Sequence, residues 1–76
     1  MSVALKKRSF SIAGHRTSVA LEEEFWAALN AEAARENIAL AALVARVDGM
    51  RGKRNLASAL RVHVLTHALG KHASAP

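Results

Sequence analysis

Apolar and polar side chains alternate along residues 15–21 (HRTSVAL), a pattern typical of a β-strand with two different faces. The two sets of side chains are Thr17, Val19 and Leu21 on one face and Arg16, Ser18 and Ala20 on the other. The first set is suited to covering a core. The second set contains no large apolar group, so we expect it to face something outside the protein.

The segment before this strand is basic and polar. Residues 1–8 include three consecutive cations and are predicted to form a basic flexible arm. Residues 9–12 (SFSI) alternate again, which is consistent with either a short strand or an extended arm. We expect a turn or bend at residues 13–15, because Gly14 tolerates a positive φ angle.

The rest of the chain predicts three helices, of which the first two are the best delimited. The first should begin near Glu22, where three consecutive acids favour the positive end of a helix dipole. It should end near Asn37, because Asn accepts the left-handed conformation that follows many helices. The second helix is predicted at residues 40–50, where apolar side chains recur at helical spacing.

The third helix is expected to run from Leu56 to Leu69, with Asn55 as its N-cap. Apolar residues cover much of its circumference, which indicates burial between subunits rather than at a surface. Gly70 is expected to end the helix and to leave a disordered tail. The chain is therefore divided into an arm, one domain and a tail, at residues 1–8, 9–69 and 70–76.

The predicted fold class is mainly α with one N-terminal β-strand. A lone strand cannot satisfy its own backbone groups, so the 16–21 strand is expected to pair with the same strand of a second copy. A chain of 76 residues is only marginally stable alone, and this one has no Cys for a disulfide or a Cys-ligated zinc. We therefore expect a homodimer.

Charge is unevenly distributed along the chain, whose net charge is +5. Residues 1–21 hold four basic residues and no acid, residues 22–48 hold six acids and two basic residues, and residues 49–76 hold five basic residues and no acid. Two basic ends would meet a polyanion while the acidic middle faces elsewhere. A simpler interpretation is that the basic termini only aid solubility.

Several classes of protein are disfavoured. No apolar run approaches the roughly 20 residues of a transmembrane helix, and no apolar stretch typical of a secretory signal follows the first basic residues, so we expect a cytoplasmic protein. The chain has no Cys, no Tyr, no Gly-rich phosphate loop and no paired carboxylates outside residues 22–24. We expect neither an enzyme nor a cofactor.

Two segments resemble the ribbon-helix-helix family of bacterial DNA-binding proteins. One is residues 7–22 (KRSFSIAGHRTSVALE) followed by Phe25-Trp26, and the other is residues 54–62 (RNLASALRV). The resemblance implies an intertwined ribbon-helix-helix homodimer with an additional C-terminal helix, since the minimal fold has no third helix. Another alignment stays open, in which the third helix is the family's second and residues 38–50 are an insertion.

The resemblance also implies how such a dimer would act, as a transcriptional regulator or repressor bound to double-stranded DNA in the nucleoid. Two copies of the 16–21 strand would form a ribbon that enters the major groove. The side chains that would contact bases are Arg16, Ser18 and Ala20. The expected phosphate contacts are Lys6, Lys7, Arg8, His15, Ala39, Leu40, Arg51, Lys53 and Arg54.

Two positions depart from the family's usual pattern. A polar residue is usual where this chain has Ala20, so direct base readout would be thin. Ser or Thr is usual at the start of the second helix, where this chain has Ala39, so that N-cap is weaker by roughly 1 kcal/mol. Specificity is then expected to depend also on the basic arm, the dimer spacing and DNA shape.

Other functions are weaker candidates. His63 and His67 stand four residues apart, a spacing that can bind a metal, but we expect no carboxylate near them and therefore structural or surface roles. The main alternative function is an antitoxin-like or adaptor dimer that binds a protein through the third helix or the tail. Binding to a membrane surface is disfavoured by the acidic middle of the chain.

Overall fold

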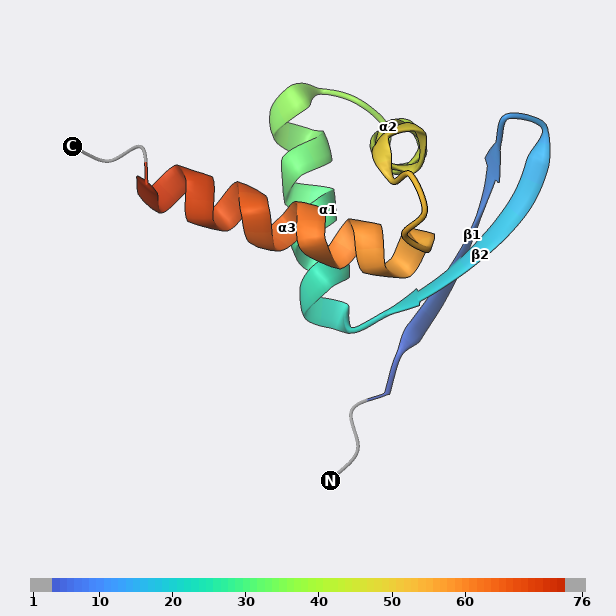
Figure 1. Cartoon of the computed structure of the whole chain (residues 1–76), viewed down its shortest axis with the longest axis horizontal. Coiled ribbons are helices and arrows are strands. Elements are labelled where there is room, and N and C mark those ends of the chain that lie inside the picture. The colour runs from blue at the N-terminus through green and yellow to red at the C-terminus, as the bar shows by residue number, and fades with distance from the viewer. Residues whose placement is uncertain (1–3, 74–76) are drawn as a thin grey trace.

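The computed structural model describes residues 4–73, with the backbone alone over 71–73. Its elements are β1 (Lys6–Ile12), β2 (His15–Leu21), α1 (Glu23–Glu36), α2 (Leu40–Met50) and α3 (Leu56–Ala73). Figure 1 shows a long twisted hairpin on one side of the helices. In this view α3 crosses α1, and α2 is seen nearly along its axis. The predicted mainly helical fold is therefore confirmed, with two strands in place of one.

The two strands are antiparallel and are joined by the two-residue loop Ala13-Gly14. Both loop residues have positive φ angles, 53° and 80°, as a type I′ hairpin turn requires. The expectation that β2 finds no partner within its own chain is therefore wrong, because β1 pairs with it along its whole length. One edge of β2 is satisfied without a second copy.

β1 also corrects the expected flexible arm, since residues 6–8 belong to this strand. The strand is anchored at its start by Trp26, whose Nε1 donates a 2.8 Å hydrogen bond to the carbonyl of Lys6. Further along, Ile12 is buried and Phe10 lies 5.9 Å from Trp26 between ring centroids. These contacts hold the basic segment against the helices.

The core lies between the inner face of the hairpin and the three helices. As the alternation in β2 predicts, Val19 and Leu21 are buried, whereas Arg16 and Ser18 on the opposite face are exposed. The most deeply buried large side chains come from every layer of the fold and are Leu21, Trp26, Leu29, Leu43, Val44 and Leu60. Because one face of β2 is buried against the helices, the side chains on its other face are the ones that a ligand can contact.

The chain direction after α1 is set by Asn37, which adopts the left-handed conformation (φ 57°). The N–H of Ile38 donates to the carbonyl of Ala33 (3.0 Å) and the N–H of Asn37 to that of Ala34 (3.1 Å), which is a Schellman motif. The predicted end of the first helix is confirmed. The bounds of α2 also agree with the prediction.

The start of α3 is confirmed and its end is not. Asn55 caps the helix, because its Oδ1 accepts a 2.8 Å hydrogen bond from the N–H of Ser58. The helix then continues through Gly70 to Ala73, so the expected end at Leu69 is wrong. A glycine costs a helix about 1 kcal/mol relative to alanine, which does not by itself end one. The remainder of the expected tail, residues 74–76, lies outside the described residues.

Three ion pairs or charged hydrogen bonds connect the helices. Arg61 on α3 binds Glu22 (3.0 Å), Arg46 on α2 binds Glu36 (2.8 Å), and His63 on α3 donates to Glu32 (2.8 Å). The hydrogen bond from Arg46 lowers the pKa of the Glu36 carboxyl. A backbone hydrogen bond within Glu22, followed by the pairing with Arg61, lowers the pKa of the Glu22 carboxyl. Most acids of residues 22–48 therefore pair with basic side chains of the same chain.

Candidate functional site

The outer face of the hairpin gathers short polar and basic side chains from both strands. Residues directly opposite in an antiparallel pair lie on the same face. The three pairs on this face are Lys7 with Ala20, Ser9 with Ser18, and Ser11 with Arg16. Five of the six are exposed and Ala20 is half-buried. The face is therefore a small, cationic and polar surface with no large apolar group.

Hydroxyl groups occupy the centre of this face. The Oγ atoms of Ser9 and Ser18 are 2.9 Å apart and hydrogen-bond to each other. A hydroxyl can both donate and accept, so each still has capacity for an outside partner. Lys7 and Arg16 stand at opposite ends of the face, one on each strand. The predicted readers Arg16, Ser18 and Ala20 are thus brought together with three residues of β1.

Three other predicted phosphate contacts of the hairpin lie away from this face. Arg8 pairs with buried Val19 and its Cζ lies 5.5 Å from the ring centroid of Trp26, which is a cation–π contact. Nζ of Lys6 is 4.0 Å from a carboxylate oxygen of Glu23. His15 is exposed at the hairpin tip, beside the turn. Lys6 and Arg8 therefore help to hold β1 on the helices.

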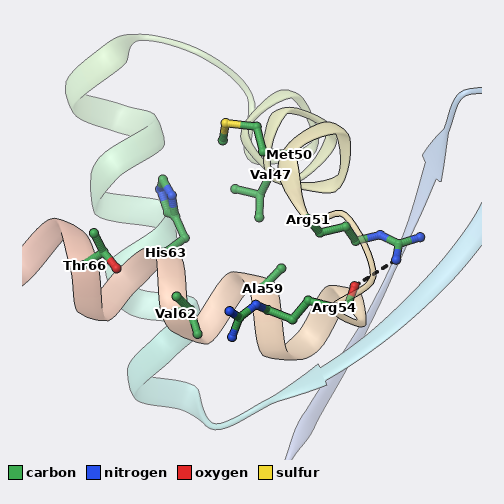
Figure 2. A pocket seen from close by; sticks show the side chains of 8 residues that line it. All are labelled: Val47, Met50, Arg51, Arg54, Ala59, Val62, His63 and Thr66. Atoms are coloured by element: carbon green, nitrogen blue, oxygen red, sulfur yellow. Dashed lines mark hydrogen bonds between the residues drawn. The ribbon is translucent and has the colours of Figure 1, made fainter.

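The basic loop between α2 and α3 is held together by Arg51. Its Nε donates to Asp48 (2.7 Å) and its Nη1 donates to the carbonyl of Arg54 (2.9 Å). Figure 2 shows the side chains of Arg51 and Arg54 pointing in opposite directions. Lys53 and Arg54 are exposed, and neither forms an ion pair with a described residue. These two residues are the loop's available cations.

A cavity of about 370 Å³ opens beside this loop, between α2 and α3. Its walls combine apolar and polar side chains (Figure 2). Arg51 is occupied by Asp48, and His63 is occupied by Glu32. Of the wall residues, Met50 is 64% exposed. The cavity therefore continues an exposed apolar surface rather than enclosing a polar binding site.

The start of α2 carries the remaining predicted phosphate contacts, Ala39 and Leu40. Ala39 is the N-cap and provides no side-chain hydrogen bond, so the first backbone N–H groups point out of the helix without a side-chain cap. An 11-residue helix is about 16 Å long, so this end and the loop at residues 51–55 lie too far apart to bind one phosphate. They would contact separate phosphates.

The described cations divide into two groups. Four are within ion-pair distance of an acid: Lys6, Arg46, Arg51 and Arg61. Among the other described side chains, Arg35 binds His67 (3.2 Å) and Arg8 covers Trp26. Lys7, Arg16, Lys53 and Arg54 are left for an outside anion. Positive charge is thus concentrated on the outer hairpin face and the α2–α3 loop.

The expectation that no carboxylate lies near the two histidines of α3 is wrong. His63 Nε2 lies 2.8 and 3.0 Å from the two carboxylate oxygens of Glu32, which is 5% exposed. The imidazoles of His63 and His67 stack with centroids 6.3 Å apart. Within the described part of the chain, no three His, Cys, Asp or Glu side chains are grouped as a metal site requires. His63 joins α3 to α1.

Sequence reasoning missed Ser9 and Ser11 as members of the site. Their alternation with Phe10 and Ile12 was the available signal, together with the two-residue loop that follows. The signal was ambiguous, because a four-residue alternation also fits an extended arm. Pairing with β2 gives these serines their place on the outer face.

A second exposed surface lies on α3. Val62, Leu65 and Leu69 are 38%, 56% and 58% exposed and recur at helical spacing, so they form one apolar stripe. Beside the stripe is an apolar groove lined by residues that include Phe25 and Ala68. Contiguous exposed apolar surface on a small domain indicates contact with another macromolecule.

Comparison with known proteins agrees with this geometry. A family model described as a ribbon-helix-helix domain matches residues 5–68. No curated protein and no solved structure matches the chain. No helix among the described residues is long and apolar enough to span a bilayer.

Proposed function

Because the chain belongs to the ribbon-helix-helix family, a family of DNA-binding regulators, we propose that it is a dimeric, sequence-specific DNA-binding protein that regulates transcription. The observation that carries this proposal is the outer hairpin face. There β2 exposes Arg16 and Ser18 while Val19 and Leu21 hold the same strand on the core. A two-stranded ribbon, formed by the β2 strands of two copies, fits the major groove of DNA.

Arg16 is the strongest base reader on this face. Its guanidinium can donate two hydrogen bonds to O6 and N7 of a guanine, which is worth roughly 1–3 kcal/mol of discrimination. Ser18 supplies an adaptable donor and acceptor, already oriented by Ser9. The methyl group of Ala20 is suited to contact with the methyl group of a thymine.

Two features support a dimer. The second edge of β2 has no partner strand among the described residues, so two copies can pair there into a four-stranded sheet with the two β2 strands at its centre. The apolar stripe of Val62, Leu65 and Leu69 offers a second surface for the partner copy. Strand pairing and apolar burial would together give the ribbon its twofold symmetry.

Electrostatic contacts to phosphates supply the rest of the affinity. Lys53 and Arg54, together with His15 and the N–H groups at residues 39–40, are the candidates in each subunit. If each subunit neutralises about four phosphates, log K falls against log salt with a slope of roughly −7. A flat response to salt would refute this electrostatic contribution.

Selection of bound sequences from random duplex DNA tests the proposal. We expect the wild-type chain to enrich a site with twofold symmetry. Arg16→Ala should weaken binding to that site at least tenfold, because one bidentate base contact is lost in each half. Arg35→Ala, an exposed arginine on α1, is the matched control and should bind normally. Failure of the wild-type chain to select any sequence would refute sequence-specific binding.

The exposed stripe on α3 also supports a second candidate function, that of a dimer which binds another protein through this stripe. If the stripe serves the partner copy, the purified chain is dimeric without any other protein. A chain that stays fully dimeric after Leu65→Ser would leave the stripe free for another protein and would favour the adaptor function.

A further inference from the structure

The pairing of β1 with β2 places a basic residue of β1 beside the small apolar residue of the predicted base-contacting set. Ala20 is the one member of the predicted reading set without a polar side chain, and Lys7 of β1 lies directly opposite it. Side chains of such a pair have Cβ atoms about 5 Å apart and project from the same face. The stem of Lys7 can therefore extend over the space that the small Ala20 side chain leaves free.

The Lys7 side chain is also available for contact with a ligand. It is exposed, and it forms no ion pair with any described acid. Its neighbour Lys6 differs in both respects, since Lys6 pairs with buried Leu21 on the opposite face and lies 4.0 Å from Glu23. Two consecutive lysines of one strand thus have different surroundings.

The width of the major groove determines which side chains of β1 are long enough to reach the bases. Neighbouring strands are about 4.8 Å apart, so β1 would lie about 7 Å from the centre of a four-stranded sheet. The major groove is about 12 Å wide, so its edge is about 6 Å from the centre and β1 lies just beyond that edge. Ser9 and Ser11 are too short to reach the bases from there. Lys7, with its four-carbon stem, can lean inward over Ala20 and reach a base edge.

We propose that Lys7 is a base reader and a specificity-determining residue, which reads guanine at the position where Ala20 alone could offer only a methyl contact. Three N–H donors on its ammonium group suit the O6 and N7 acceptors of guanine. The inference rests on the proposed DNA-binding function and replaces the expected phosphate contact of Lys7 with a base contact. Reading would then use both strands of the hairpin, Arg16 from β2 and Lys7 from β1.

The test compares the duplex selected by the wild-type chain with variants of that duplex changed at single base pairs. We expect one guanine per half-site whose replacement weakens wild-type binding about tenfold. Lys7→Ala should remove that preference, so that guanine and its replacements bind alike. Lys7→Arg should retain it, because a guanidinium also binds guanine. Lys6→Ala, one residue away on the other face, is the matched control and should keep the full preference.

Two outcomes would overturn the inference while leaving the proposed function intact. One is that Lys7→Ala weakens binding equally to all duplexes and reduces the salt slope by about 1 per subunit, the signature of a phosphate contact. The other is a preference at this position, for example for thymine, that survives Lys7→Ala. Failure of the proposed function is recognised separately, because wild type and Arg16→Ala would then bind every duplex alike.

Discussion

The hydrogen bond from His63 to Glu32 should be worth a large part of the stability of the domain. Glu32 is 5% exposed, so its carboxylate depends on protein donors rather than on water. Replacing His63 with Leu removes a hydrogen bond to a charged group, for which the typical cost is about 1.5–3 kcal/mol. A chain of 76 residues has a free energy of unfolding of about 4–11 kcal/mol, so the loss would be conspicuous.

Two features of the site adjust this magnitude. Arg46 is close enough to Glu32 for the two charges to interact, which partly compensates the carboxylate when His63 is gone. The side chain of His63 is 21% exposed, so water can reach the gap that it leaves. We therefore expect His63→Leu to cost about 2 kcal/mol, within the range for a hydrogen bond to a charged group and below the cost of breaking a fully buried pair.

A double-mutant cycle measures the interaction itself. Urea unfolding can be followed by the fluorescence of Trp26, which is buried and is the one tryptophan of the chain. The protein concentration must be held constant because assembly into the proposed dimer would contribute to the apparent stability. Glu32→Leu combined with His63→Leu should restore most of the lost stability, because two apolar groups replace the pair.

The control for this cycle is His67→Leu, one turn further along α3. His67 is exposed and bonds only to Arg35 among described residues, so its replacement should change the free energy of unfolding by less than about 0.5 kcal/mol. The reasoning is refuted if His63→Leu is equally mild. Strictly additive effects of the two single replacements would refute it as well, because no coupling would then exist between them.

Three further predictions test other parts of the fold. Ala13→Asn should raise the free energy of unfolding by about 0.5–1 kcal/mol, because Asn before Gly14 suits the positive φ angles of this turn; a lower melting temperature would contradict it. NMR titration should place the pKa of Glu36 below its ordinary value, so the Arg46 pair stabilises the fold above about pH 5 and is lost on acidification; Arg46→Ala should flatten this dependence, and an unshifted Glu36 would count against it. Leu65→Ser should weaken dimerisation about tenfold in sedimentation and leave the fold intact; an unchanged dimer would exclude the α3 stripe as its interface.

Local chemistry explains which parts of the fold could be predicted. Asn37 ends α1 and Asn55 begins α3 through hydrogen bonds within a few residues of each, so the sequence itself contains both partners. Alternation in β2 likewise assigned Val19 and Arg16 to opposite faces without any knowledge of the neighbouring strand. These predictions needed no contact between distant segments.

The wrong predictions depended on such distant contacts. The strand character of β1 rests on pairing with β2 and on the bond from Trp26 to the carbonyl of Lys6, 20 residues away. The environment of His63 is set by Glu32, 31 residues away on another helix. Neither spacing carries a periodic signal, so the sequence predicts an arm where the structure has β1, and it predicts no carboxylate beside His63.

The hairpin changes the physical reason for a dimer. A strand without a partner would require a second copy for its backbone, but β1 already satisfies one edge of β2. Exposed apolar surface is now the stronger reason for a dimer, because three large side chains of α3 are between 38% and 58% exposed on a domain that has few residues with which to cover them. Weakening that stripe should therefore dissociate the proposed dimer before it disturbs the hairpin. The proposed DNA affinity should fall with it, even though the side chains proposed to read bases are still in place.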